Sequence, residues 1–108
     1  MYNFGDVILA SVQFTNTFEI KKRPALVLAD LEGNDVVLCQ ITSEARFDKD
    51  SLKLKASDFK KGKLSVVSMI RPNKLFTADI STIHYKVGSL KIEKINKTIE
   101  TLIRLIRG

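Results

Sequence analysis

Two continuous apolar runs separated by one turn cluster set the strongest constraint on how this chain can fold. Residues 24–29 read PALVLA, residues 35–41 read DVVLCQI, and the turn cluster EGND at 32–35 leads from one into the other. Such runs are typical of strands buried on both faces, and the short connection predicts an antiparallel hairpin. Burial on both faces indicates a small barrel or a sheet covered by a helix.

Three further segments have the composition of strands. The predicted strands are DVILASV at 6–12, SLKLK at 51–55 and LSVVSMI at 64–70. We expect the last to stop at Arg71-Pro72, and we expect KKGK at 60–63 to form a solvated turn. Pro24 is expected at the start of its strand or on an edge, because it has no N–H to donate. Residues 76–87 are compatible with short helical turns or with another strand.

The C-terminal part of the chain changes period. Apolar side chains recur at intervals of three and four, which predicts an amphipathic helix from about Leu90 to Arg107. Leu105 falls away from this stripe, which suggests that the helix end touches a second surface such as another subunit. The stripe consists of Ile92, Ile95, Ile99, Leu102, Ile103 and Ile106. The predicted fold is mainly β within an α+β class: a five- or six-stranded antiparallel barrel with one terminal helix, in a single domain spanning 1–108.

The charge balance favours an anionic partner. The chain has 18 Lys and Arg against 12 Asp and Glu, a net charge of +6 and a pI near 9.6. Nucleic acid, an acidic protein and a lipid headgroup surface all fit this surplus. The N-terminus has no basic leader, and no apolar stretch approaches the length of a membrane span. We therefore expect a cytoplasmic protein with no membrane association.

Several common catalytic arrangements are missing from the sequence. His84 is the only histidine and is expected on the surface or in a loop, and no phosphate-binding GxxxxGK motif occurs. The single cysteine, Cys39, lies inside an apolar run, which indicates a buried structural thiol rather than a nucleophile. We expect no metal and no cofactor.

The basic cluster KKR at 21–23 runs directly into the first apolar strand. It could keep a sheet edge from pairing, or the strand could aim Arg23 at an anion. Arg23 and Thr42 are about equally far from the turn, so antiparallel pairing places them side by side. A guanidinium fork beside a hydroxyl suits phosphate oxygens. The alternative is that Arg23 forms a surface ion pair with Glu19 or Glu44, with Thr42 only ending its strand.

The polar loop before the basic cluster has the composition of a single-stranded RNA contact. Bases stack on aromatic rings and present their edges to amides and hydroxyls. Thr15, Asn16 and Phe18 could supply these contacts, whereas Phe14 is expected to fill the core.

Taken together, several blocks of the sequence resemble the MazF/PemK toxins of toxin–antitoxin modules. The blocks are GDVILASVQFT, KKRPALVLA, VVLCQITS and SMIRPNKLFTADISTI, followed by the C-terminal helix. They occur in the family's order and run over nearly the whole chain. The most specific element is KxRPALVL followed, after a turn and a strand, by ITS.

The resemblance implies an SH3-like barrel of the MazF/CcdB type that forms a homodimer. It implies sequence-specific, metal-independent cleavage of single-stranded RNA, including mRNA, by attack of the 2′-OH. The products would be a 2′,3′-cyclic phosphate and a 5′-OH end, and translation would be inhibited. It also implies a cognate acidic antitoxin, with a disordered segment that blocks the active site.

By position, the family's active-site arginine falls on Arg23 and its threonine on Thr42. Arg71 matches a position that is basic in part of the family. The loop before Arg23 lacks the family's EQGG-like element, and Glu19 could stand in for its acidic residue at a spacing one residue shorter. Base preference depends on such loops, so the resemblance does not extend to the cleavage sequence. The residues assigned to RNA binding are Thr15, Asn16, Phe18, Lys21, Lys22, Ser43 and Arg71.

In this mechanism Arg23 is the phosphate clamp and the acid, and Thr42 positions a phosphoryl oxygen. The base is left open between Glu19 and a group on the substrate. Two other functions compete with the nuclease: a non-catalytic protein-binding toxin resembling the gyrase poison CcdB, and an inert RNA-binding barrel.

Overall fold

A curled antiparallel sheet is the main element of the computed structural model, which describes residues 2–13, 19–44 and 49–108. Within these residues seven strands are hydrogen-bonded in the order β4-β6-β3-β2-β1-β7-β5. The strands are β1 (Asp6–Gln13), β2 (Ile20–Asp30), β3 (Asp35–Thr42), β4 (Leu52–Leu54), β5 (Phe59–Gly62), β6 (Ser68–Asp79) and β7 (Ile83–Leu90). The helices are the 3-10 turns η1 (Ala56–Asp58) and η2 (Ile80–Thr82) and the α-helix α1 (Ile92–Arg107).

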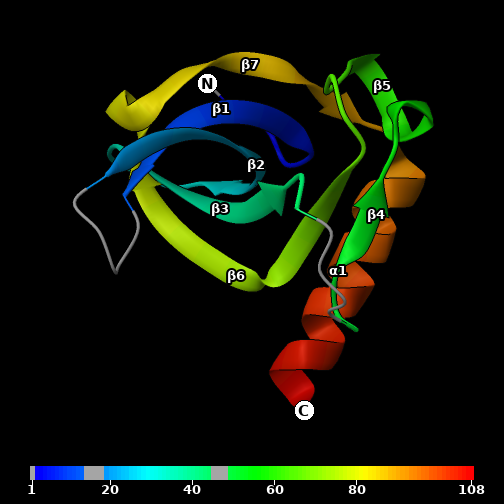
Figure 1. Ribbon diagram of the computed structural model, residues 1–108. Helices are drawn as coiled ribbons and strands as arrows, with labels where there is room; N and C mark the ends of the chain where they lie inside the picture. The colour runs from blue at the N-terminus through cyan, green and yellow to red at the C-terminus, as the bar shows by residue number, and fades with distance from the viewer. Residues whose placement is uncertain (1, 14–18, 45–48) are drawn as a thin grey trace.

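The two edge strands, β4 and β5, follow one another in the chain and are joined through η1. The sheet must therefore curl until its edges approach each other. Figure 1 shows this curl running from β7 through β1, β2 and β3 to β6, with β4, β5 and α1 together on one side. The predicted barrel-like β fold with one C-terminal helix is confirmed, although the described residues form seven strands where five or six were expected. No helix of the described residues is both long and apolar enough to span a membrane.

Two hydrophobic cores lie on the two faces of the sheet, as the uninterrupted apolar runs predict. Neighbouring residues of β2 alternate between them: Leu26 belongs to the first core, and Ala25 and Val27 belong to the second. The first core contains Val7, Leu26, Cys39, Ile41, Leu54, Phe59, Ile70 and Leu90. The second contains Ile8, Ala10, Ala25, Val27, Val36 and Leu38.

The β2–β3 hairpin is confirmed, with Ala25 opposite Gln40 and Leu26 opposite Cys39. The strand β2 nevertheless begins at Ile20, so the basic cluster lies within the strand rather than before it. Pro24 is opposite Leu9 of β1, inside β2, and is not the first residue of the strand. In the described residues the β2–β3 ladder ends at Ala25, so β2 is not paired with β3 at Pro24. A proline is tolerated there because no backbone N–H is required to bond to β3.

Two predictions about the second half of the sheet are wrong. Residues 60–62 belong to β5, which pairs with β7, and Gly62 lies opposite Gly88. The two backbones can approach this closely because glycine has no side chain; a Cβ atom at Gly62 would collide with the Val87 carbonyl oxygen. The strand expected at 64–70 begins at Ser68 and continues through Arg71-Pro72 as β6. Consecutive β3 residues, Gln40 and Cys39, pair with Arg71 and Leu75, so an irregularity in the ladder accommodates Pro72. The ambiguous stretch 76–87 contains the end of β6, η2 and part of β7.

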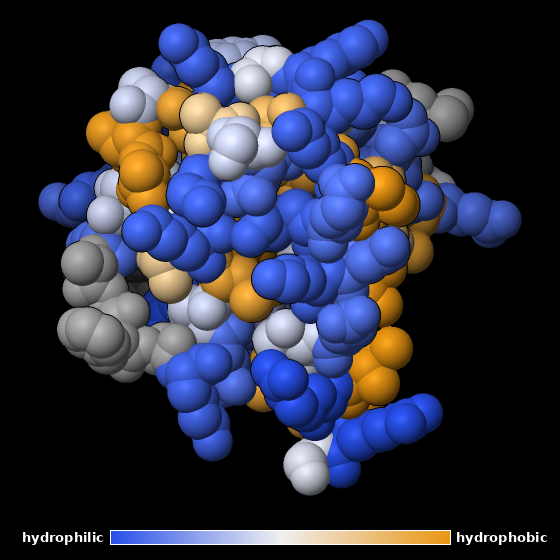
Figure 2. Space-filling model, turned by 90° about the vertical axis from the view of Figure 1, so that its right-hand side faces the viewer, coloured by the Kyte–Doolittle hydropathy of each residue, from blue (hydrophilic) through white to orange (hydrophobic). Residues whose placement is uncertain are grey.

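The helix α1 is confirmed, but its packed face differs from the predicted stripe. Thr98 and Thr101 are its buried residues, and Leu105 is half-buried beside them. The hydroxyls of Thr98 and Thr101 donate to the carbonyl oxygens of Lys94 and Lys97 at 2.9 and 3.0 Å. Both threonines can therefore be buried without leaving a hydroxyl group that lacks a hydrogen bond. Three stripe residues instead face outward: Ile92, Ile103 and Ile106 are 61%, 45% and 79% exposed. Figure 2 shows apolar surface along one side of the lower half of the molecule, where the helix runs.

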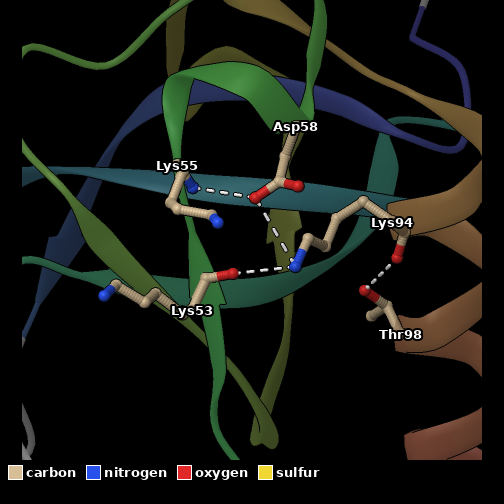
Figure 3. A network of polar contacts seen from close by, with 5 residues as sticks. All are labelled: Lys53, Lys55, Asp58, Lys94 and Thr98. Atoms are coloured by element: carbon tan, nitrogen blue, oxygen red, sulfur yellow. Dashed lines mark hydrogen bonds and ion pairs between the residues drawn. The ribbon is translucent and has the colours of Figure 1, made fainter.

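A polar network fastens α1 to the region where the sheet edges approach each other (Figure 3). Lys94 Nζ donates to the Lys53 carbonyl oxygen at 2.8 Å and lies 3.5 Å from Asp58 Oδ2. The same Asp58 oxygen accepts the backbone N–H of Lys55 at 2.8 Å, which holds η1. The side chains of Lys94 and Asp58 are only 13% and 19% exposed, so this pair is shielded from solvent screening.

We expect Lys94→Met to lower the free energy of unfolding by about 1–3 kcal/mol, because it removes a charge-assisted hydrogen bond and leaves Asp58 without this cation. Urea denaturation measures the change. Lys97→Met, on the exposed side of the same helix, is the control and should alter stability by less than about 0.5 kcal/mol. Equal effects of the two substitutions would show that the network does not stabilise the fold.

Candidate active site

A cavity of about 510 Å³ opens beside the ends of β2 and β3 that lie away from their turn. Part of its lining is apolar: Leu9 and Ile41 come from β1 and β3, and Leu64 and Val87 pack against the first core. Polar side chains complete the lining, most of them from strands or strand ends and two, Lys63 and Ser65, from the segment between β5 and β6. The polar residues are Arg23, Thr42, Ser43, Lys63, Ser65, Ser68, Tyr85 and Lys86.

Arg23 and Thr42 both line this cavity, as their equal distance from the turn predicts. The β2–β3 ladder ends with Ala25 opposite Gln40, and Arg23 and Thr42 each lie two residues beyond that pair. Both residues are half-buried. The Thr42 hydroxyl oxygen accepts the N–H of Glu44 at 3.2 Å, a bond that fixes the side chain without using the hydroxyl proton. This arrangement offers a guanidinium and a hydroxyl donor to one anion.

The other residues predicted to bind RNA are distributed unevenly around the cavity. Ser43 is exposed and lines it. Lys21 and Lys22 are exposed on β2 next to Arg23, and Lys21 Nζ lies 3.6 Å from Glu19 Oε2. Arg71 is half-buried on β6 opposite Gln40 and is not among the residues that line the cavity. The predictions for Phe14, Thr15, Asn16 and Phe18 lie outside the described residues.

Sequence reasoning missed the polar residues of the cavity wall that lie outside the β2–β3 hairpin. Tyr85 is 58% exposed and offers an aromatic ring, and Lys63 adds a positive charge. Lys86 Nζ lies 3.1 Å from the buried carboxylate of Asp6, so its positive charge also compensates that buried negative charge. These residues are distant in sequence from the hairpin, and only the pairing of β7 with β1 brings Tyr85 opposite Leu9.

His84 is exposed, as predicted, but it is not isolated. Its Nε2 lies 2.6 Å from the Ser11 hydroxyl on the neighbouring strand. Among the described ranges, no group of three or more His, Cys, Asp and Glu side chains is placed to hold a metal ion.

Cys39 is fully buried, as predicted for a structural thiol. Its Sγ donates to the Arg71 carbonyl oxygen at 3.0 Å. Burial raises the pKa of this thiol from 9.0 to about 12, and the backbone hydrogen bond offsets only part of that increase. Cys39 therefore stays protonated at neutral pH and is not a nucleophile.

Comparison with solved structures shows the same fold in several toxins, although the sequence identities are low. A mycobacterial endoribonuclease superposes with a TM-score of 0.72 at 15% identity, covering 95% of this chain and 88% of that one. A MazE–MazF complex from Deinococcus radiodurans gives 0.72 at 18% identity, covering 97% and 94%. A mycobacterial endoribonuclease in complex with its cognate antitoxin gives 0.67 at 17% identity, covering 94% and 93%.

The sequence itself places the chain in a family. A search of curated proteins finds no match. The family model for PemK-like, MazF-like toxins of type II toxin–antitoxin systems, however, matches residues 3–106. The chain belongs to this toxin family.

Proposed function

We propose that this protein is the toxin of a toxin–antitoxin module and acts as a metal-independent endoribonuclease on single-stranded RNA. Cleavage of mRNA would inhibit translation. The observation that carries the proposal is the convergence of Arg23 and Thr42 on one cavity. Family membership supports it, as do similar structures that are named endoribonucleases.

The proposed reaction is an internal phosphoryl transfer. The ribose 2′-oxygen attacks the adjacent phosphorus, its proton passes to a base, and the bond from phosphorus to the 5′-oxygen breaks. The products are a 2′,3′-cyclic phosphate and a 5′-OH end. Arg23 stabilises the charge on the phosphoryl oxygens and, as the acid, gives a proton to the leaving 5′-oxygen, which it then regains from solvent; Thr42 positions a phosphoryl oxygen.

The surroundings of the cavity suit an RNA strand. Lys21 and Lys22 are exposed on the same strand as Arg23, where they can attract the phosphate backbone. Tyr85 offers a ring on which a base can stack. An inert RNA-binding barrel or a protein-binding toxin would not need a guanidinium and a hydroxyl that line one cavity, so this arrangement favours the nuclease.

The wild-type protein should cut labelled single-stranded RNA at discrete sites in the presence of EDTA, leaving 2′,3′-cyclic phosphate ends. Arg23→Ala should reduce the cleavage rate by about 100-fold or more, because the main charge on the phosphate is lost. Lys60→Ala, a lysine of β5 outside the cavity wall, is the control and should cut normally.

Three outcomes would contradict the proposal of a metal-independent nuclease. Binding of RNA without cuts would indicate an RNA-binding barrel, and neither binding nor cutting would indicate a protein-binding toxin. Cleavage that requires added metal would contradict the proposed chemistry.

We further propose that the protein forms a homodimer through the exposed side of α1. The apolar line of Ile92, Ile103 and Ile106 is flanked by Glu93 near the start of the helix and Arg107 near its end. Two copies of this helix packed antiparallel would bury the isoleucines and bring each Glu93 close to the other copy's Arg107. The contact would be the same surface on both subunits, as a two-fold dimer requires.

Sedimentation should give a dimer at tens of micromolar, and Ile106→Asp should shift it to a monomer because the charge would be buried in the contact. The control is Leu31→Asp, another exposed apolar residue that lies beside the β2–β3 turn, and it should remain dimeric. A monomeric wild type, or a dimer that tolerates Ile106→Asp, would contradict this interface.

The proposed partner is a cognate antitoxin with an acidic, partly disordered segment. Such a segment would complement the net charge of +6 and could fold over the lysines next to Arg23, covering the cavity. Two of the similar structures are complexes with a protein partner, a MazE–MazF pair and an endoribonuclease with its cognate antitoxin.

A further inference from the structure

A second, smaller hollow adjoins the first and shares two of its residues. It has a volume of about 260 Å³, and Arg23 and Pro24 line both hollows. The remaining residues of its wall are Val12, Gln13, Gln40, Lys74, Leu75 and Phe76. Arg23 therefore lies on the divide between two spaces of different size and composition.

The strand register places the second hollow at the end of the second core. Ala25 and Leu38 belong to that core; Gln40 lies opposite Ala25, and Phe76 lies opposite Leu38. Phe76 also packs against the core. One side of the hollow is thus an aromatic residue held in place by the packed interior.

The polar groups of this hollow are unusual for the chain. Gln13 and Gln40 are the only two glutamines in the sequence, and both line this one space. They come from different strands, β1 and β3, and only the folded sheet brings them to the same wall. Each amide offers both a donor and an acceptor, which is the pattern that the edge of a nucleobase presents.

We propose that this hollow holds the nucleobase next to the phosphate that Arg23 clamps. Gln13 and Gln40 read the edge of the base, and Phe76 with Leu75 supplies the apolar surroundings that its flat faces require. The neighbouring nucleotide lies on the other side of Arg23, in the larger cavity beside Tyr85. The proposal rests on the nuclease function and adds to it a determinant of the cleavage sequence.

The chemistry of the wall favours a base over other occupants. A site for phosphate would be expected to contain more cations than Arg23 and Lys74. An aliphatic side chain in the hollow would leave the two amides without hydrogen-bond partners. A planar ring with donors and acceptors on its edge satisfies the amides and the apolar residues together.

The test is cleavage of a single-stranded RNA library with a randomised segment, followed by sequencing of the cut ends. Gln40→Leu keeps the approximate volume of the side chain and removes the amide. It should lower discrimination about tenfold or more at one position next to the cut bond, and leave the preferences at other positions unchanged. Gln13→Leu should affect the same position. The control is Asn34→Ala, which removes an amide at the far end of the β2–β3 hairpin and should keep the full profile.

The outcomes separate this inference from the function on which it rests. A wild-type protein that does not cut RNA would overturn both. If the wild type cuts and both glutamine variants keep its profile, the base pocket is wrong and the nuclease stands. A Gln40→Leu variant that cuts with an unchanged profile but resists inhibition by the antitoxin would assign the hollow to the protein partner instead. Circular dichroism of each variant checks that the fold is intact.

Discussion

The pairing of β2 with β3 is the constraint on which the rest of the structure depends. Both strands are buried on both faces, and their register sets Ala25 opposite Gln40. A slip of one residue would move every apolar side chain of one strand to the wrong core, so the register is strongly specified. The same register carries the ends of both strands, with Arg23 and Thr42, to one cavity, so the packing of two cores positions the candidate site.

The position of Pro24 explains why the charged end of β2 is accessible. The proline has no N–H to donate, and in the described residues the ladder to β3 ends one residue later, at Ala25. The strand remains paired with β1 along this stretch, so it stays rigid while its other edge is open. This opening lets Arg23 line two hollows from one backbone position. In the proposed function, an RNA strand crosses the sheet at this point.

Local patterns predict the parts of the structure that depend on short-range geometry. The hairpin, the position of α1 and the placement of Arg23 and Thr42 at the same end of the hairpin follow from run lengths and from counting outward from one turn. The course of β6 through Pro72 does not follow, because an irregularity opposite Gln40 accommodates the proline. The strand β5 depends on the close approach of Gly62 to Gly88, which are distant in sequence.

The packed face of α1 and much of the cavity wall were also beyond sequence reasoning. Hydrophobic periodicity points to the isoleucines, yet the helix buries Thr98 and Thr101, whose hydroxyls bond within the helix. Tyr85, Lys63 and the two glutamines reach the candidate site from strands and loops whose mutual positions are set by long-range pairing.

The central claim is that a rigid strand holds one guanidinium for the chemical step while its neighbours only attract RNA. Single-turnover cleavage at saturating enzyme tests this most directly, with Arg23→Lys compared with the double variant Lys21→Ala/Lys22→Ala. We predict that Arg23→Lys loses most of the rate, because an ammonium does not provide the two-pronged contact. The double variant should keep the rate of the chemical step but bind RNA more weakly and with less dependence on salt. A wild-type rate for Arg23→Lys, or loss of the chemical step in the double variant, would contradict the account.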